Sequence, residues 1–137
     1  MARILVAGLI NYETNLRVEG FPIEYDPVRY PFFGVTSDTS GVGYNVAKAL
    51  TRLGHEVRFL ALIGQDGLGR IVMHDLERDE IPTDWVRQDL AETPQSVILF
   101  DGEGRRQINV DLKDIQERVY PLKPFELAME GCDLLVL

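Results

Sequence analysis

Polar side chains that could bind a hydroxylated ligand follow the first apolar run of the chain. Asn11 and Glu13 come shortly after residues 3–8, which are apolar almost throughout. Such a run is typical of a strand buried on both faces of a parallel sheet. Open α/β sheets bind ligands at the carboxyl ends of their strands, so both residues are candidate binding residues. The alternative interpretation of Glu13 is a solvated loop acid.

A second candidate group lies where a loop turns into a helix. Gly41 and Gly43 stand at the start of an amphipathic segment, and Asn45 follows them. Glycine lets the backbone come close to a ligand, and the first N–H groups of a helix have no partner within it. Asn45 offers both a donor and an acceptor. The alternatives are an Asn45 bonded to local backbone and a dinucleotide fingerprint, which here lacks its third glycine.

The composition excludes several classes of function. The net charge of −8 and the lack of a basic run argue against a nucleic-acid or anionic-membrane surface. The single cysteine, Cys132, allows no internal disulfide, and the apolar runs are too short to span a membrane, so we expect a cytoplasmic protein. His55 and His74 have no partners at metal-ligand spacing, so no metal site is predicted, and nothing supports a catalytic triad.

Apolar periodicity predicts an α/β fold with a mostly parallel sheet. The predicted elements are a strand at 3–8, a helix at 41–53, a strand at 56–63, helices at 66–79 and 125–130, and a strand at 133–137. Asp66 is the expected N-cap of its helix. Because an apolar strand at the end of a chain is unlike a solvated tail, we expect a fragment or truncated product of a longer protein.

Two segments do not fit this layered pattern. Residues 15–39 are rich in proline and aromatic residues, and residues 95–110 read as a strand, a glycine-containing turn at 101–104 and a second strand. The apolar residues of the second segment alternate with polar ones. These residues, Val97, Leu99, Ile108 and Val110, are expected to form one apolar face that mediates a homodimer.

At its glycines the chain resembles the ribokinase-like (PfkB) family of carbohydrate and nucleoside kinases. The residues in register with the first signature of that family are Gly41, Gly43, Asn45, Ala47, Gly54 and Gly64. Ser40 departs from it, because the family usually has Gly or Ala there. The resemblance covers the whole chain but only the first half of the family pattern, since the Gly-rich loop with the catalytic Asp is missing.

The resemblance implies a three-layer, Rossmann-like domain of which residues 1–137 are the N-terminal part, with segments 15–39 and 95–110 inserted as a small β-lid. It implies the substrate-binding half of an ATP-dependent sugar kinase that phosphorylates a hydroxymethyl group. ATP and Mg²⁺ would serve the full-length enzyme, and this chain alone is expected to bind neither and to be inactive. The alternative is a non-catalytic polyol-binding or dimerisation module.

The implied binding residues for a small sugar or nucleoside are Asn11, Glu13, Gly41, Gly43 and Asn45, and no catalytic residue is assigned. Glu13 stands where the family has Asp. Its extra methylene shifts the carboxylate by about 1.5 Å, which implies a different or smaller polyol.

Overall fold

The computed structural model describes all 137 residues and contains two four-stranded sheets. The strands of the first sheet are β1 (Arg3–Ala7), β4 (Glu56–Gly64), β5 (Val86–Leu90) and β8 (Leu134–Val136). Those of the second are β2 (Asn11–Arg17), β3 (Val35–Ser40), β6 (Gln95–Phe100) and β7 (Arg106–Asp111). The helices are α1 (Val42–Arg52), α2 (Gly67–Arg78), α3 (Leu122–Met129) and the short 3-10 helix η1 (Ile115–Glu117).

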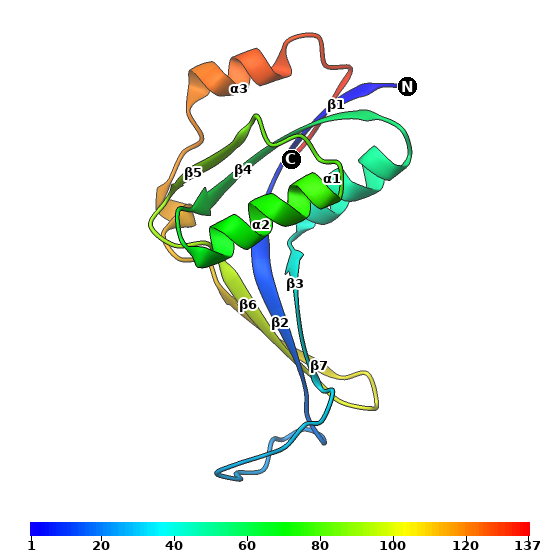
Figure 1. Cartoon of the computed structure of the whole chain (residues 1–137), viewed down its shortest axis with the longest axis vertical. Helices are drawn as coiled ribbons and strands as arrows, with labels where there is room; N and C mark the ends of the chain where they lie inside the picture. The colour runs from blue at the N-terminus through cyan, green and yellow to red at the C-terminus, as the bar shows by residue number, and fades with distance from the viewer.

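The first sheet is parallel, in the order β5-β4-β1-β8, and forms the centre of a helical body. The second sheet, in the order β3-β2-β6-β7, extends from that body as a lid (Figure 1). In the lid, β2 and β6 are parallel, whereas the outer pairs are antiparallel. The α/β class and the small β-lid that we predicted are therefore confirmed.

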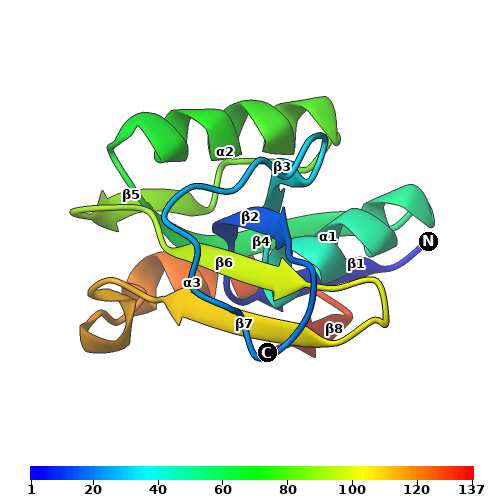
Figure 2. The same ribbon diagram turned by 90° about the horizontal axis from the view of Figure 1, so that it is seen from below.

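Helices cover both faces of the parallel sheet (Figure 2). Alternate residues of β1 point to opposite faces, so Ile4 joins the larger apolar cluster under α1 and α2, and Leu5 joins a smaller one under α3. Phe59 is fully buried in the larger cluster. The body thus has the three layers of a doubly covered α/β sheet.

The start of α2 follows the prediction from sequence. The Asp66 carboxylate accepts a hydrogen bond from the Gly69 N–H at 2.9 Å, which confirms Asp66 as the N-cap. At the end of α1, Gly54 has a φ of 82°, a conformation that glycine adopts without strain. Both helices lie within two residues of their predicted bounds.

Two boundaries and one strand differ from the predictions. The lid begins at Asn11 rather than at residue 15, so Asn11 and Glu13 lie in strand β2 and not in a loop. Strand β5 was not predicted, because its centre is polar and only its ends, Val86 and Leu90, are buried. Helix α3 begins at Leu122, three residues before the predicted start at 125.

The prediction of one apolar face on the hairpin is wrong. Val97 and Leu99 lie on one face of the lid, and Ile108 and Val110 lie on the other, because directly paired residues share a face and even-numbered residues pair with even-numbered ones. The connecting turn has five residues, Asp101–Arg105, instead of the four expected. One extra residue in the turn moves every side chain of the second strand to the opposite face.

Candidate functional site

The body and the lid meet where β1 leads into β2 and β3 leads into α1. Asn11, the first residue of β2, pairs with Ser40, the last residue of β3. Gly41 follows at once as the N-cap residue of α1. The fold thus brings Asn11 next to the start of α1, at the carboxyl end of β1, where open α/β sheets bind ligands.

The two signature glycines allow this junction to pack closely. Gly41 has a φ of 110°, and a Cβ there would lie 2.5 Å from the Leu9 carbonyl oxygen. A Cβ on Gly43 would lie 2.6 Å from the Gly8 carbonyl carbon. The backbone of α1 therefore touches the connection between β1 and β2, a contact that no larger residue allows.

The first N–H groups of α1 are only partly available to a ligand. The N–H groups of Gly43 and Tyr44 donate to the Leu9 carbonyl oxygen at 3.0 and 3.3 Å. The expectation of free N–H groups at the helix start is therefore wrong for these two residues. Contact of Gly41 and Gly43 with a substrate stays a prediction.

A chain of hydrogen bonds connects Asn11 to Glu13. Asn11 Nδ2 donates to Ser96 Oγ at 3.0 Å, and Ser96 Oγ lies 3.4 Å from Glu13 Oε2, to which it donates. Asn15 Nδ2 donates to the other oxygen, Glu13 Oε1, at 3.3 Å. Glu13 is half-buried, so it is not the solvated loop acid of the alternative interpretation. Sequence reasoning missed Ser96, although its place in the predicted strand after residue 95 was a usable signal.

Asn11 carries an unpaired polar atom. The residue is only 4% exposed, and its Oδ1 is buried without a hydrogen-bond partner. A buried acceptor without a partner costs about 1–3 kcal/mol, so such atoms are uncommon in stable folds and often mark functional positions.

Asn45 lies one turn into α1 and is exposed. Its backbone N–H donates to the Gly41 carbonyl oxygen at 2.9 Å, as expected inside a helix, and no hydrogen bond to protein holds its side chain. The amide of Asn45 is therefore available to a ligand, rather than satisfied by local backbone.

Asp66 connects α2 to the segment that enters the lid. Its carboxylate accepts bonds from the Thr93 hydroxyl at 2.6 Å and the Thr93 N–H at 3.1 Å. Burial acts to raise the pKa of Asp66, but these bonds and the one from Gly69 outweigh it and leave the pKa lowered. Because β6 begins two residues after Thr93, Asp66 helps to place Ser96 beside Asn11.

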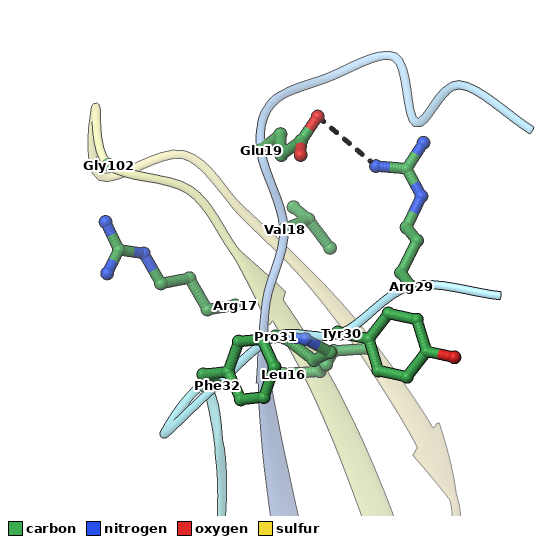
Figure 3. Close-up of a pocket in the computed structure, with 10 residues that line it drawn as sticks. Leu16, Arg17, Val18, Glu19, Arg29, Tyr30, Pro31, Phe32 and Gly102 are labelled. Carbon is green, nitrogen blue, oxygen red and sulfur yellow. Dashed lines mark ion pairs between the residues drawn. The ribbon is translucent and has the colours of Figure 1, made fainter. Parts of the chain in front are cut away.

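A hollow that is separate from this junction lies at the tip of the lid (Figure 3). It encloses roughly 620 Å³ and is lined in part by Tyr30 and Phe32, whose rings stack with centroids 6.2 Å apart. Arg29 and Glu19 form an ion pair of 3.5 Å at its edge. None of the predicted binding residues lines this hollow.

The structure has neither a membrane-spanning helix nor a cluster of metal ligands. None of its helices has the combination of length and apolar character needed to cross a bilayer. No three His, Cys, Asp or Glu side chains are gathered in a way that could hold a metal ion.

The fold and the junction together define an α/β protein whose parallel sheet is joined to a β-lid at the strand ends, the place where open α/β sheets bind ligands. Residues 1–130 match the family model described as pfkB family carbohydrate kinase. The chain therefore belongs to the pfkB family of carbohydrate kinases, as its glycines indicated.

Relatives and solved structures agree with this assignment. An uncharacterized sugar kinase of Archaeoglobus fulgidus is 37% identical over 62 residues, which are 45% of this chain and 25% of that protein. A microbiome-derived acarbose kinase matches 98% of this chain and 44% of its own, with 21% identity and a TM-score of 0.84. Ribokinase of Cryptococcus neoformans var. grubii, solved with ADP, matches 81% and 35%, with 28% identity and a TM-score of 0.63. The chain spans less than half the length of each of these proteins.

Proposed function

We propose that this chain is the substrate-binding part of a cytoplasmic, ATP-dependent carbohydrate kinase that phosphorylates a hydroxymethyl group of a sugar or nucleoside. Membership of the pfkB family supports a carbohydrate kinase. The chain corresponds to less than half of the kinases that it resembles in structure, which supports a role in only part of their chemistry.

The observation that carries the proposal is the buried, unpaired Oδ1 of Asn11 at the carboxyl end of β1. A substrate hydroxyl that donates to this atom would satisfy it. Glu13 lies two residues along the same strand, and Asn45 lies one turn into the neighbouring helix. Together these side chains offer the mixed donors and acceptors that a polyol needs.

Binding of this kind is most of what phosphoryl transfer requires of a protein. The reaction involves little covalent chemistry by side chains, so catalysis depends on positioning and on electrostatic stabilisation. Asn11, Glu13 and Asn45 would orient the acceptor sugar, while Gly41 and Gly43 let α1 come close to it. No residue of this chain is assigned as the general base.

Two features argue against binding of ATP by this chain alone. The N–H groups of Gly43 and Tyr44, at the most suitable helix start, are already bonded to Leu9. No three His, Cys, Asp or Glu side chains gather into a metal site. We therefore assign the nucleotide, the metal ion and the base to residues outside this chain, in a longer protein.

Coupled assays of ADP release test the proposed activity. The 137-residue chain should give no turnover with ribose, fructose, deoxygluconate or adenosine. A chain extended through the second family signature should phosphorylate at least one sugar or nucleoside. Turnover by the short chain would show that the base lies within it, and a silent long chain would favour a binding module.

Calorimetric titration tests the binding residues directly. Replacement of Asn45 by Ala should weaken the binding of a neutral polyol by about 1–3 kcal/mol, because ligand hydroxyls lose their partner. Asn109→Ala is the matched control, since Asn109 lies on β7 and its side chain donates to the Val97 carbonyl oxygen. An unchanged affinity in Asn45→Ala would remove Asn45 from the site.

A non-catalytic module that binds a polyol or dimerises is the second candidate. Ile108 and Val110 favour it, because they are 56% and 50% exposed on an outer strand of the lid. Exposed apolar residues on a sheet edge promote association, so a homodimer through the lid belongs to either proposal.

A further inference from the structure

The half of the lid surface next to the body carries two acidic side chains and no basic one on one of its faces. We call the side of the lid on which Glu13 lies the Glu13 face. Asp38 of β3 pairs directly with Glu13 of β2, and paired residues share a face. The neighbouring Thr39 points to the opposite face, where its hydroxyl donates to Asp75 of α2 at 2.6 Å. The two carboxylates therefore lie side by side, on the face turned away from α2.

No cation neutralises this pair of acids. Neither Glu13 nor Asp38 forms an ion pair, whereas Asp79, Asp101 and Asp111 each do so. Glu13 receives bonds only from the neutral donors Ser96 and Asn15, at 3.4 and 3.3 Å, and Asp38 receives none.

Arg17 is the next charged residue along the same face of β2, four positions beyond Glu13. At the rise of a strand this is about 13 Å, which exceeds the screening length of physiological salt. Arg17 therefore leaves the charges of the two acids largely uncompensated.

Asn11 independently points to a ligand at the same place. Its side chain is linked through Ser96 Oγ to Glu13, and its Oδ1 is buried and unpaired. On this half of the face both charges are negative, and the unpaired buried atom beside them, Asn11 Oδ1, is an acceptor as well. A group with several donors and a positive charge would match them best.

We propose that the preferred substrate carries a protonated amine and that Glu13 and Asp38 bind it on the Glu13 face. This inference rests on the proposed function, because it assigns a substrate class to the same site. An ammonium group supplies three donors and a charge, and charge-assisted hydrogen bonds are about twice as strong as neutral ones. The same two carboxylates repel sugars that carry an acid.

Three open-chain ligands that differ at a single carbon test the inference. They are 1-amino-1-deoxyglucitol, glucitol and gluconate, which end in an ammonium, a hydroxyl and a carboxylate. Titration calorimetry of the 137-residue chain should give the tightest binding to the amine, by about tenfold over glucitol, and the weakest to gluconate. In Asp38→Asn the preference for the amine should fall about threefold or more, and Glu13→Gln should act in the same direction.

Asp84→Asn is the matched control, because Asp84 is exposed and precedes β5, an edge strand of the parallel sheet and not part of the lid. It changes the net charge equally and should keep the preference for the amine. Circular dichroism of each variant shows whether it is folded. Equal binding of amine and glucitol, or tighter binding of glucitol, would overturn the inference and leave the proposed function standing. Failure of all three ligands to bind would overturn the inference together with the proposed polyol site.

Discussion

The body and the lid each contain a four-stranded sheet but are stabilised in different ways. In the body, the three central residues of β1 are buried, and one apolar cluster joins the sheet to α1 and α2. In the lid, every residue of β7 is exposed, and the buried residues of β2 and β6 include the polar Asn11 and Ser96. The body is therefore held by apolar burial, whereas the lid depends on backbone pairing and polar contacts.

This difference separates the strands that build the core from the strands that carry polar side chains. A strand that is not needed for the core can carry acids, amides and exposed apolar side chains without loss of the fold. The candidate site lies at the boundary of the two regions, where Asn11 is buried like a body residue but is polar like a lid residue.

Truncation of an aromatic side chain in each region should show the largest contrast. Phe59→Ala should lower the free energy of unfolding by about 3–5 kcal/mol, because Phe59 is fully buried under α1 and α2. Phe33→Ala, which truncates a fully exposed side chain at the lid tip, should change it by less than about 0.5 kcal/mol. Urea unfolding measures both. A large loss in Phe33→Ala would mean that the lid contributes a core of its own.

A substitution at the contact between body and lid should cause the next largest loss of stability. Gly43→Ala should destabilise the chain by about 1–3 kcal/mol, since the new Cβ would meet the backbone of Gly8 at 2.6 Å. Gly102→Ala is the control, because nothing lies within 4 Å of a Cβ there. Urea unfolding of both variants compares them. Equal stability would show that the junction can relax at no cost.

A smaller loss is expected where Asp66 holds the entry to the lid. Asp66→Asn keeps one acceptor oxygen but replaces the other by an NH₂ group, so at least one of the bonds from Gly69 and Thr93 is lost, which should cost about 1–2 kcal/mol. Asp84→Asn should change the free energy of unfolding by less than about 0.5 kcal/mol, because Asp84 is exposed. Thermal unfolding of the two variants makes the comparison. Similar midpoints in both would exclude Asp66 as an anchor.

Low pH should lower the stability of the body through Asp79, whose carboxylate accepts hydrogen bonds from Lys48 and the Tyr44 hydroxyl. Burial acts to raise the pKa of Asp79, but these bonds and nearby cations outweigh it and lower the pKa. A group with a lowered folded pKa stabilises the protein above its unfolded pKa, about 3.9, and loses that contribution as the pH falls further. The midpoint temperature of thermal unfolding should therefore fall as the pH drops below about 4. This fall should be smaller in Asp79→Asn. An identical pH profile for this variant would contradict the assignment.

The smallest effect on stability is expected from changes to the outer faces of the lid, where only association should respond. Ile108→Glu with Val110→Glu alters the Glu13 face, and Val97→Glu with Leu99→Glu alters the opposite face. If a homodimer forms through the lid, sedimentation should show dissociation in only one of these variants, with the body still folded. Dissociation in neither variant, or a monomeric parent chain, would rule out a dimer through the lid.

Much of the body could be predicted from sequence because its patterns are local. The apolar runs before Gly8 and Gly64, the helical spacing of α1 and the cap at Asp66 each specify an element without long-range information. Strand β5 was not predicted, because it is an edge strand with a polar centre and therefore has no apolar run to detect.

The lid was harder to predict because its structure depends on register. The five-residue turn after Phe100 determines which side chains share a face, and sequence pattern does not reveal turn length. The roles of Ser96 and Asp38 depend on the pairing of β2 with strands distant in the chain. Asn11 and Glu13 were identified as candidates, but their burial and partners could come only from the structure.

The close contact between Gly8 and Gly43 lies where the lid joins the body. Strand β2 has seven residues, so at the rise of a strand it reaches about 23 Å from its base to the aromatic tip. A rotation of about 10° at that base would carry the tip through about 4 Å, several times the displacement at Asn11 near the pivot. The two glycines thus stand where any change in the angle between body and lid would produce the largest displacement of the outer loop.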